Sequence, residues 1–300
     1  MKPGTRSFYA LAVQRAIDHI AATLDEALDL EALASRACLS TFHFHRVFKG
    51  MVGETPLELN RRLRLERAAA RLVAGQQSVT EIAFDAGYET HEAFTRAFRG
   101  SYSTSPSGFR QRAFPRIEIA ATCGVHYHPE GGTVPFVPRD SGGQHMEVVI
   151  EQMPALRVAG VPHTGPYNQI SLAFGQLGAI AGPAGLFKHP GAAMIALYHD
   201  DPDTVPQDQL RSDAAIVVPD DATLPAGLVE QRLAGGPYAR TLHVGPYETL
   251  GDAWARFMGE WLPASGHRVG AGASYEIYRN DPRTTPKEEL RTDLYIPLAS

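Results

Sequence analysis

The stretch Ser40-Thr-Phe-His-Phe-His-Arg-Val-Phe-Lys49 has the pattern of a short helix with two different faces. Ser40 is of a type that caps helix N-termini, and Phe44, Val47 and Phe48 then form an apolar stripe at helical spacing. The opposite face carries aromatic, imidazole and cationic groups, namely Phe42, His45, Arg46 and Lys49. Such a face suits base edges and phosphates, although an ordinary amphipathic surface helix would show a similar pattern.

The residue pattern of this helix recurs about fifty residues later. Four residues of the first copy, Phe44, Arg46, Phe48 and Lys49, are matched by Phe94, Arg96, Phe98 and Arg99. Upstream, Leu33-Ala34 and Ala37 correspond to Ile82-Ala83 and Ala86. In each copy, alanines stand where a second helix must cross closely, and a tight turn follows. The repeat therefore predicts a duplicated helix-turn-helix, with first helices at about 30–37 and 79–86.

These motifs resemble the AraC family of transcriptional regulators over roughly residues 8–112. The resemblance implies two recognition helices in neighbouring major-groove turns of double-stranded promoter DNA, joined by one long helix. RNA polymerase is then a further candidate partner. The residues expected to contact DNA are Thr41, Phe42, His45, Arg46, Lys49, His91, Glu92, Thr95, Arg96 and Arg99. Glu92 would repel phosphate, so we expect it to accept a hydrogen bond from a cytosine amino group.

Capping signals delimit the element between the two units. Thr55 and Glu58 predict a long helix that begins with a capping box and ends at Gly75, where glycine permits a left-handed residue. Ser78 and Glu81 form a second capping box, which opens the second unit. The connecting helix carries several arginines, and we expect a solvated face to explain most of them.

The composition of the chain argues against secreted, membrane-spanning, disulfide-rich and metal-binding proteins. The 300 residues suffice for two or three domains, and the sequence has neither a long apolar run nor a basic-then-apolar N-terminus. We therefore expect a cytoplasmic protein without membrane contact. Cys38 and Cys123 are the only cysteines, and neither belongs to a CxxC pair, so no disulfide framework, metal or other cofactor is expected. The pattern around Cys38 favours a small buried residue.

Charge is distributed unevenly along the chain. Residues 1–116 hold 16 basic and 12 acidic side chains, whereas residues 117–300 hold 12 basic and 21 acidic ones. This asymmetry is typical of a DNA-binding module attached to a module that does not bind DNA. Between them, residues 113–145 are rich in glycine and proline, which predicts a linker with one short strand at 117–125.

A second duplication fills the remainder of the chain. His163-Thr-Gly-Pro-Tyr167 recurs 80 residues later as His243-Val-Gly-Pro-Tyr247, and the motif at 201–213 recurs at 281–293. Each half reads as strand, Gly-Pro turn, amphipathic helix, strand and strand. The predicted fold is thus multidomain α plus α/β. Its parts are an all-α tandem helix-turn-helix domain at 1–112, a linker at 113–145 and a duplicated βαββ domain at 146–300.

The second duplication resembles the GyrI-like effector-binding domain over about residues 146–298. The residues that carry the resemblance are His243-Val-Gly-Pro-Tyr247, Trp254, Tyr275-Glu-Ile-Tyr278, Asn280-Asp-Pro282 and Leu290-Arg-Thr-Asp-Leu-Tyr-Ile-Pro297. The resemblance implies a pocket for small molecules, often amphipathic cations, with aromatic walls and a central glutamate. Glu276 is the residue at that position.

The physical chemistry of Glu276 points the same way. It lies in a predicted strand where an apolar residue would be unremarkable, and its counterpart in the first half is Ala196. A carboxylate among aromatic rings is desolvated, which favours binding of a cation with an apolar body. The candidate ligand-binding residues are Glu276, Tyr275, Tyr278, Trp254, Tyr247, Tyr167 and Phe174. A structural ion pair or a solvent-facing position of Glu276 is the alternative, as is a purely structural role for the rings.

The sequence thus predicts a DNA-binding transcriptional regulator whose C-terminal domain binds a small cationic or aromatic effector. One alternative is a hydrolase or sequestering module for reactive small molecules, in which Glu276, assisted by Tyr278, acts as general base towards water. Another is a C-terminal domain that docks a protein and binds no ligand. The regulator itself is not expected to be an enzyme.

Overall fold

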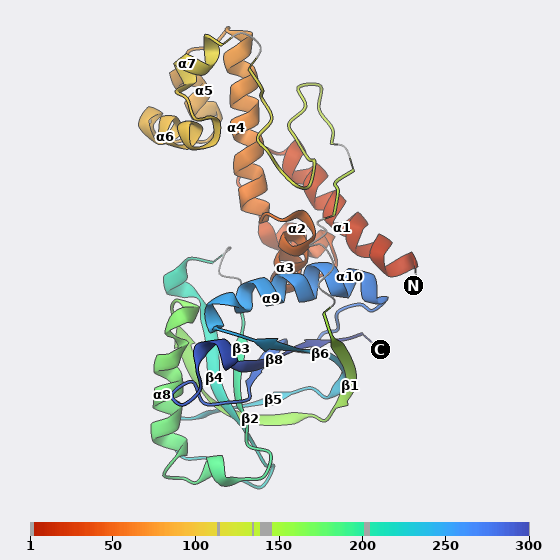
Figure 1. Ribbon diagram of the computed structural model, residues 1–300, viewed down its shortest axis with the longest axis vertical. Coiled ribbons are helices and arrows are strands. Elements are labelled where there is room, and N and C mark those ends of the chain that lie inside the picture. Colours follow the sequence, from red (N-terminus) through yellow and green to blue (C-terminus); the bar gives the residue numbers. More distant parts are fainter. Residues whose placement is uncertain (1–2, 113–114, 134, 139–145, 201–204, 300) are drawn as a thin grey trace. The chain divides into compact units, whose positions relative to one another are not determined.

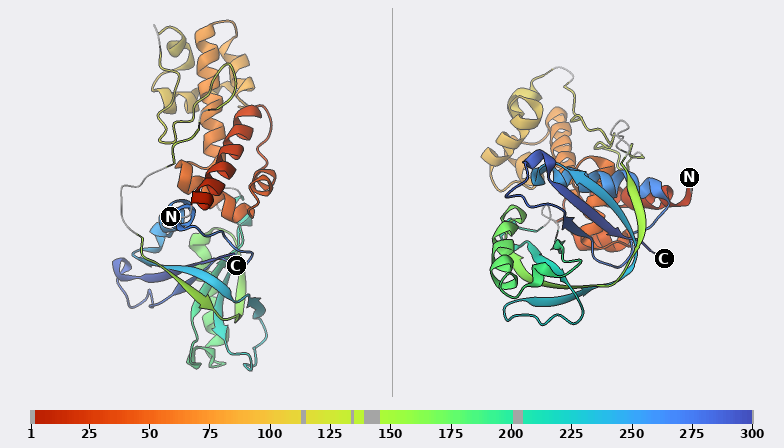
Figure 2. Two further views of the ribbon diagram at one scale, coloured as in Figure 1. Left: turned by 90° about the vertical axis from the view of Figure 1, so that its right-hand side faces the viewer. Right: turned by 60° about the horizontal axis from the view of Figure 1, so that its bottom comes forward.

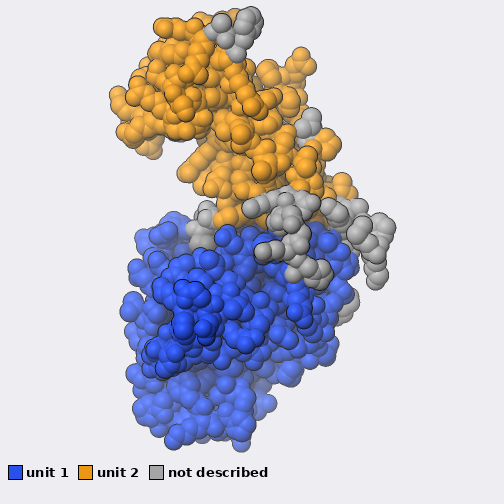
Figure 3. Space-filling view, in the orientation of Figure 1, with its two compact units in different colours: residues 1–8, 41–46, 141–300 blue, residues 9–40, 47–140 orange. Residues whose placement is uncertain are grey.

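The computed structural model describes residues 3–112, 115–133, 135–138, 146–200 and 205–299 (Figure 1). They form two compact units, coloured separately in Figure 3. Of the described residues, the sheet unit comprises 3–8, 41–46, 146–200 and 205–299, and the helical unit comprises 9–40, 47–112, 115–133 and 135–138. The predicted combination of an all-α region with a duplicated strand-rich domain is confirmed.

The N-terminal helices follow the predicted order. They are α1 (Pro3–Ala22), α2 (Leu30–Arg36), α3 (Thr41–Val52), α4 (Pro56–Ala74), α5 (Val79–Asp85), α6 (His91–Tyr102) and α7 (Pro106–Arg110). The apolar stripes predicted for the two recognition helices are buried, since Phe44, Phe48, Phe94 and Phe98 are at most 1% exposed. The segment Thr41–Arg46 of α3 clusters with the sheet unit, and the rest of α3 with the helical unit.

Local capping signals set both ends of α4 and the start of α5 as predicted. The Thr55 hydroxyl accepts from the Glu58 backbone N–H while the Glu58 carboxylate accepts from the Thr55 N–H. Ser78 and Glu81 make the same reciprocal pair. Gly75 ends α4 with a φ of 74°, a left-handed conformation that glycine adopts without steric cost.

The arginines of α4 are used inside the helical unit, which corrects the expectation of a solvated face. Arg62 donates to both carboxylate oxygens of Glu54, and Arg67 donates to Asp25 and to the Asp85 carbonyl. Arg64 donates to the carbonyl oxygen of Leu24. Both Arg62 and Arg67 are buried. These cations therefore hold neighbouring elements against α4.

The strand predicted at 117–125 is not formed. The backbone N–H groups of Ile119 and Tyr127 donate instead to the carboxylate of Glu66, at 2.9 and 2.8 Å. The Val125 carbonyl accepts from Arg62 at 2.8 Å. Because α4 supplies these partners, the backbone of this segment needs no neighbouring strand. The described part of the predicted linker, 115–133, thus packs on α4.

Cys38 is exposed, which corrects the expectation that it is buried. It lies in the turn between α2 and α3 with a φ of 56°. Gly87 holds the equivalent place in the second copy, with a φ of 81°. The turn therefore imposes a left-handed residue, and only the second copy has a glycine there.

The sheet unit is built on eight described antiparallel strands. They are β1 (Val148–Met153), β2 (Leu156–Thr164), β3 (Met194–Tyr198), β4 (Arg211–Val218), β5 (Val229–Leu233), β6 (Gly236–Val244), β7 (Tyr275–Tyr278) and β8 (Arg291–Pro297). Their order across the sheet is β1-β6-β8-β7-β3-β4-β2-β5. Helix α8 spans Ile170–Ala181, and α9 (Leu250–Arg256) continues through a π-helical turn at Phe257–Trp261 into α10 (Leu262–Ser265).

The duplication predicted from the 80-residue spacing organises this sheet. Beyond each predicted βαββ unit, the structure adds a leading strand, β1 or β5. Each leading strand pairs with the other half, β1 with β6 and β5 with β2. At the centre β3 pairs with β7, and Ala196 lies directly opposite its repeat counterpart Glu276.

The two faces of the sheet have different cores. Figure 2 shows a curled sheet with α8 along one face. On that face, Ala173 and Leu177 of α8 pack with Ala159, Ala214 and Ile216. The other face buries a cluster that includes Tyr238, Tyr275 and Tyr295. Among the helices that the structure describes, none is both long and apolar enough to span a bilayer.

Candidate functional site

Glu276 lies in the central strand β7 and is only 2% exposed. One carboxylate oxygen accepts a hydrogen bond from the indole N–H of Trp254 in α9, at 2.7 Å. The other accepts from the hydroxyl groups of Tyr278 at 2.8 Å and Tyr198 at 3.2 Å. No described side chain forms an ion pair with Glu276. The structure therefore contradicts both alternatives considered for Glu276, a structural ion pair and a solvent-facing position.

Further aromatic rings surround these donors. The Tyr247 and Phe174 rings meet the Tyr278 ring edge to face, with centroids 5.3 and 5.5 Å apart. The Tyr167 ring lies 4.7 Å from that of Tyr198. The strand β7, the helices α8 and α9 and the two Gly-Pro turns thus bring most of the predicted ligand-binding residues to one carboxylate.

The predicted site is wrong at two tyrosines, one wrongly included and one missed. Tyr275 stacks on Tyr295 with centroids 4.7 Å apart, in the core on the opposite face of the sheet. It lies there because neighbouring residues of a strand point to opposite faces. Tyr198, which the sequence analysis omitted, lies in the site instead. It stands 80 residues before Tyr278, which is the spacing of the repeat. Aligning the two halves of the duplication would therefore have identified it from the sequence.

Burial controls the proton equilibria of the site. Desolvation raises the pKa of the Glu276 carboxyl, although the hydrogen bonds from Trp254 and Tyr278 and the charge of Arg46 oppose this rise. Desolvation, followed by the charge of Glu276, raises the pKa of the Tyr198 and Tyr278 hydroxyl groups well above the ordinary value. Both hydroxyl groups therefore stay protonated and donate to the carboxylate.

Part of the first predicted DNA-contacting face belongs to the sheet unit. The Phe42 ring meets the Trp254 ring edge to face at 6.5 Å, and His43 lies 3.1 Å from the Ser274 hydroxyl. The guanidinium carbon of Arg46 lies 4.5 Å from the centre of the Phe42 ring and 5.0 Å from that of Trp254. Of the other residues predicted on this face, His45 is buried, and Thr41 and Lys49 are half-buried.

The corresponding face of the second copy is open. Glu92, Arg96 and Arg99 on α6 are exposed, whereas His91 and Thr95 are half-buried. Thr90 caps this helix by accepting from the Ala93 N–H at 3.1 Å. The α6 residues thus present two guanidinium groups and a carboxylate to solvent.

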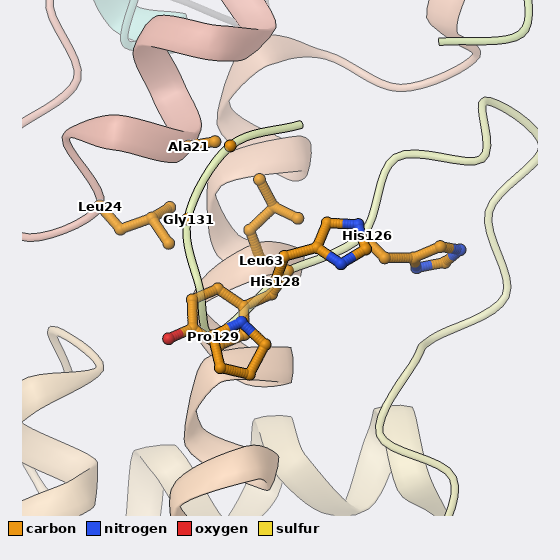
Figure 4. Close-up of a pocket in the computed structure, with 9 residues that line it drawn as sticks. Ala21, Leu24, Leu63, His126, His128, Pro129 and Gly131 are labelled. Carbon is orange, nitrogen blue, oxygen red and sulfur yellow. The ribbon is translucent and has the colours of Figure 1, made fainter. Parts of the chain in front are cut away.

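A hollow of about 110 Å³ lies within the helical unit (Figure 4). Its walls come from α1, α4 and the 115–133 segment. They are Ala21, Leu24, Leu63, His126, Tyr127, His128, Pro129, Gly131 and Gly132. This lining contains no carboxylate, lysine or arginine side chain, so we do not take the hollow as a second candidate site.

Comparison with known proteins agrees with this architecture. Residues 146–299 match the family described as the GyrI-like small molecule binding domain, over more than half of the chain. The chain belongs to the GyrI-like family. Residues 33–112, upstream of this GyrI-like domain, match a helix-turn-helix domain model, and the resemblance to AraC-type regulators is confirmed.

Curated relatives match one part of the chain or the other. A DNA gyrase inhibitor of Yersinia enterocolitica is 33% identical over 140 residues, which cover 45% of this chain and 87% of the inhibitor. Regulatory protein SoxS of Salmonella typhimurium is 30% identical over 100 residues, covering 33% of this chain and 94% of SoxS. The helix-turn-helix regulator YbfP of Bacillus subtilis is 36% identical over 103 residues, and the match covers 34% of this chain and 35% of YbfP.

Proposed function

We propose that this chain is a DNA-binding transcriptional regulator whose GyrI-like domain binds a small cation with an apolar body. The observation that carries the effector assignment is the Glu276 carboxylate, buried among aromatic rings without an ion-pair partner among the described residues. A buried charge of this kind is costly to keep, and a cation that reaches it gains both a counter-charge and ring faces.

The same geometry favours binding over the hydrolytic alternative. Trp254, Tyr198 and Tyr278 donate to both oxygens of Glu276, and the residue is 2% exposed. A general base needs a water molecule within hydrogen-bond reach and a free lone pair directed at it. A carboxylate held by three donors is instead a fixed counter-charge.

The DNA-binding part of the proposal rests on the tandem helix-turn-helix and on the solvent-facing arginines of α6. SoxS and YbfP, which match this part, are described as a regulatory protein and a transcriptional regulator. Arg96 is of the residue type that reads guanine edges in the major groove. We propose that Arg46, Arg96 and their helical neighbours contact the promoter.

A calorimetric titration tests the effector assignment. Phenylguanidinium supplies a planar cation with an aromatic body, and phenylurea is a neutral compound of similar shape. We expect the full chain to bind phenylguanidinium at least about tenfold more tightly than phenylurea, and Glu276→Gln to abolish this preference. The exposed Glu288→Gln is the matched control and should retain it. Equal affinity of the wild type for both compounds would refute the assignment.

A further inference from the structure

Arg46 has an unusual environment for a residue expected to read DNA. Its guanidinium lies over the Phe42 and Trp254 rings, at 4.5 and 5.0 Å from their centres. Its Nε atom is buried and has no hydrogen-bond partner among the described residues. Rings, and not hydrogen bonds to Nε, thus hold the cation in place.

Trp254 connects this cation to the effector site. The face of its indole ring carries Arg46, while its N–H donates to Glu276 at 2.7 Å. Burial raises the pKa of both the Glu276 carboxyl and the Tyr198 hydroxyl, and the charge of Arg46 opposes this rise, so the guanidinium lies within electrostatic reach of the site. The site therefore already contains a planar cation supplied by the chain itself.

We propose that Arg46 is an intramolecular competitor of the effector: its guanidinium occupies the cation-binding surface at Trp254, and a cationic effector displaces it. This inference rests on the proposed effector function of Glu276. It also specifies the ligand class, because the effector must offer a cation that stacks on indole at least as well as a guanidinium does.

The displacement would regulate DNA binding. Arg46 cannot stack on Trp254 and contact a base at the same time, whereas its repeat counterpart Arg96 is exposed. A ligand that binds only when Arg46 has left Trp254 shifts the population towards chains whose Arg46 is free to contact a base. The effector and the DNA then assist each other, and by linkage each strengthens the binding of the other by the same factor.

The competition is testable on the full chain without DNA. Phenylguanidinium affinity should rise about tenfold in Arg46→Gln, because the internal competitor is removed. Arg46→Lys keeps the charge but loses the stacking plane, and should raise the affinity about threefold. Arg96→Gln removes the equivalent arginine of the second copy and should leave the affinity unchanged.

The outcomes separate this inference from the proposed function. Equal affinities of the wild type and Arg46→Gln overturn the competition while leaving the cation site intact. An effect of Arg46→Gln without any effect of Arg46→Lys also overturns it, because charge alone then explains the change. Failure of phenylguanidinium to bind any of these chains overturns the effector site itself.

Coupling to DNA gives a second measurement. A binding site selected from a random duplex library would be titrated with and without saturating phenylguanidinium. We expect a tighter complex with the ligand for the wild type and for Trp261→Phe, a control that retains Trp254. Arg46→Gln should show no ligand effect, because nothing remains to be displaced. A ligand effect of the same size in Arg46→Gln would overturn the inference.

Discussion

His43 is a titratable side chain enclosed in the sheet unit beside Ser274. Desolvation, followed by the charge of Arg46, lowers its pKa from 6.5 to about 4. A histidine with a lowered pKa contributes stability that is present above pH 6.5 and is lost as the pH falls towards 4. We expect the free energy of unfolding to fall by up to about 3 kcal/mol over this range from this residue.

Denaturant titrations between pH 7 and pH 4 measure this loss. His43→Asn keeps a polar group near Ser274 but cannot take up a proton, so its stability should fall less steeply with acid. The exposed His189→Asn is a control for histidine removal and should follow the wild type. Identical pH profiles of the wild type and His43→Asn would contradict the prediction.

At the residue scale, the sequence predicted Glu276 among aromatic rings, where the structure also has it, but the prediction included Tyr275 and missed Tyr198. Glu276 was singled out because the resemblance puts a central glutamate at that position and because a carboxylate in an apolar strand needs a physical explanation. Tyr275 was wrongly included because it belongs to the matching run Tyr275–Tyr278, whereas neighbouring residues of a strand point to opposite faces of a sheet. Tyr198 was missed because a lone tyrosine carries no chemical signal, and only the repeat spacing relates it to Tyr278.

The turn between α2 and α3 offers a test at the scale of one element. Cys38 adopts a left-handed conformation that disfavours any residue with a β-carbon, and its exposure means that little packing is lost on truncation. Cys38→Gly should therefore stabilise the chain by about 0.5–1 kcal/mol. Cys38→Ala removes the thiol but keeps the β-carbon, so its thermal midpoint should stay near that of the wild type.

Helix α4 holds the 115–133 segment through one buried carboxylate. Glu66 is 0% exposed and receives hydrogen bonds from two backbone N–H groups and from Arg62. In Glu66→Gln the amide N–H₂ would face a donor, so we expect a loss of about 3 kcal/mol in unfolding free energy. Limited proteolysis should then cut within 115–133, whereas the exposed Glu118→Gln should stay resistant. Full resistance of Glu66→Gln would contradict this role.

Elements were predictable where their signals are local. The capping boxes at Thr55 and Ser78 and the glycine at 75 define both ends of α4 and the start of α5, because caps involve residues within one helical turn. The segment after residue 115 was not predictable, because its backbone partners are Glu66 and Arg62, more than fifty residues upstream. The leading strands β1 and β5 were not predicted for the same reason, because each pairs with a strand of the other repeat, far away in the sequence.

At the scale of the whole molecule, basic and acidic side chains are concentrated in different parts of the chain. The net charge of −5 hides a basic first part and an acidic remainder. We expect DNA affinity to fall steeply with salt, and Arg99→Gln to reduce the slope of log affinity against log salt by about one. The exposed Arg291→Gln on β8 should leave the slope unchanged. An unaltered slope in Arg99→Gln would remove it from the phosphate contacts.

The pairing of β1 and β5 with the opposite repeat bears on how such a domain could evolve and on whether its halves can fold separately. Neither repeat closes its own sheet, since each donates its first strand to its twin. A single ancestral repeat would leave the backbone groups of its edge strand unpaired, and it would pair them by dimerising with an identical chain. Gene duplication would then join two chains that already exchanged a strand. A cut in the stretch between β4 and β5 should accordingly give two pieces that reassemble together and that aggregate when kept apart.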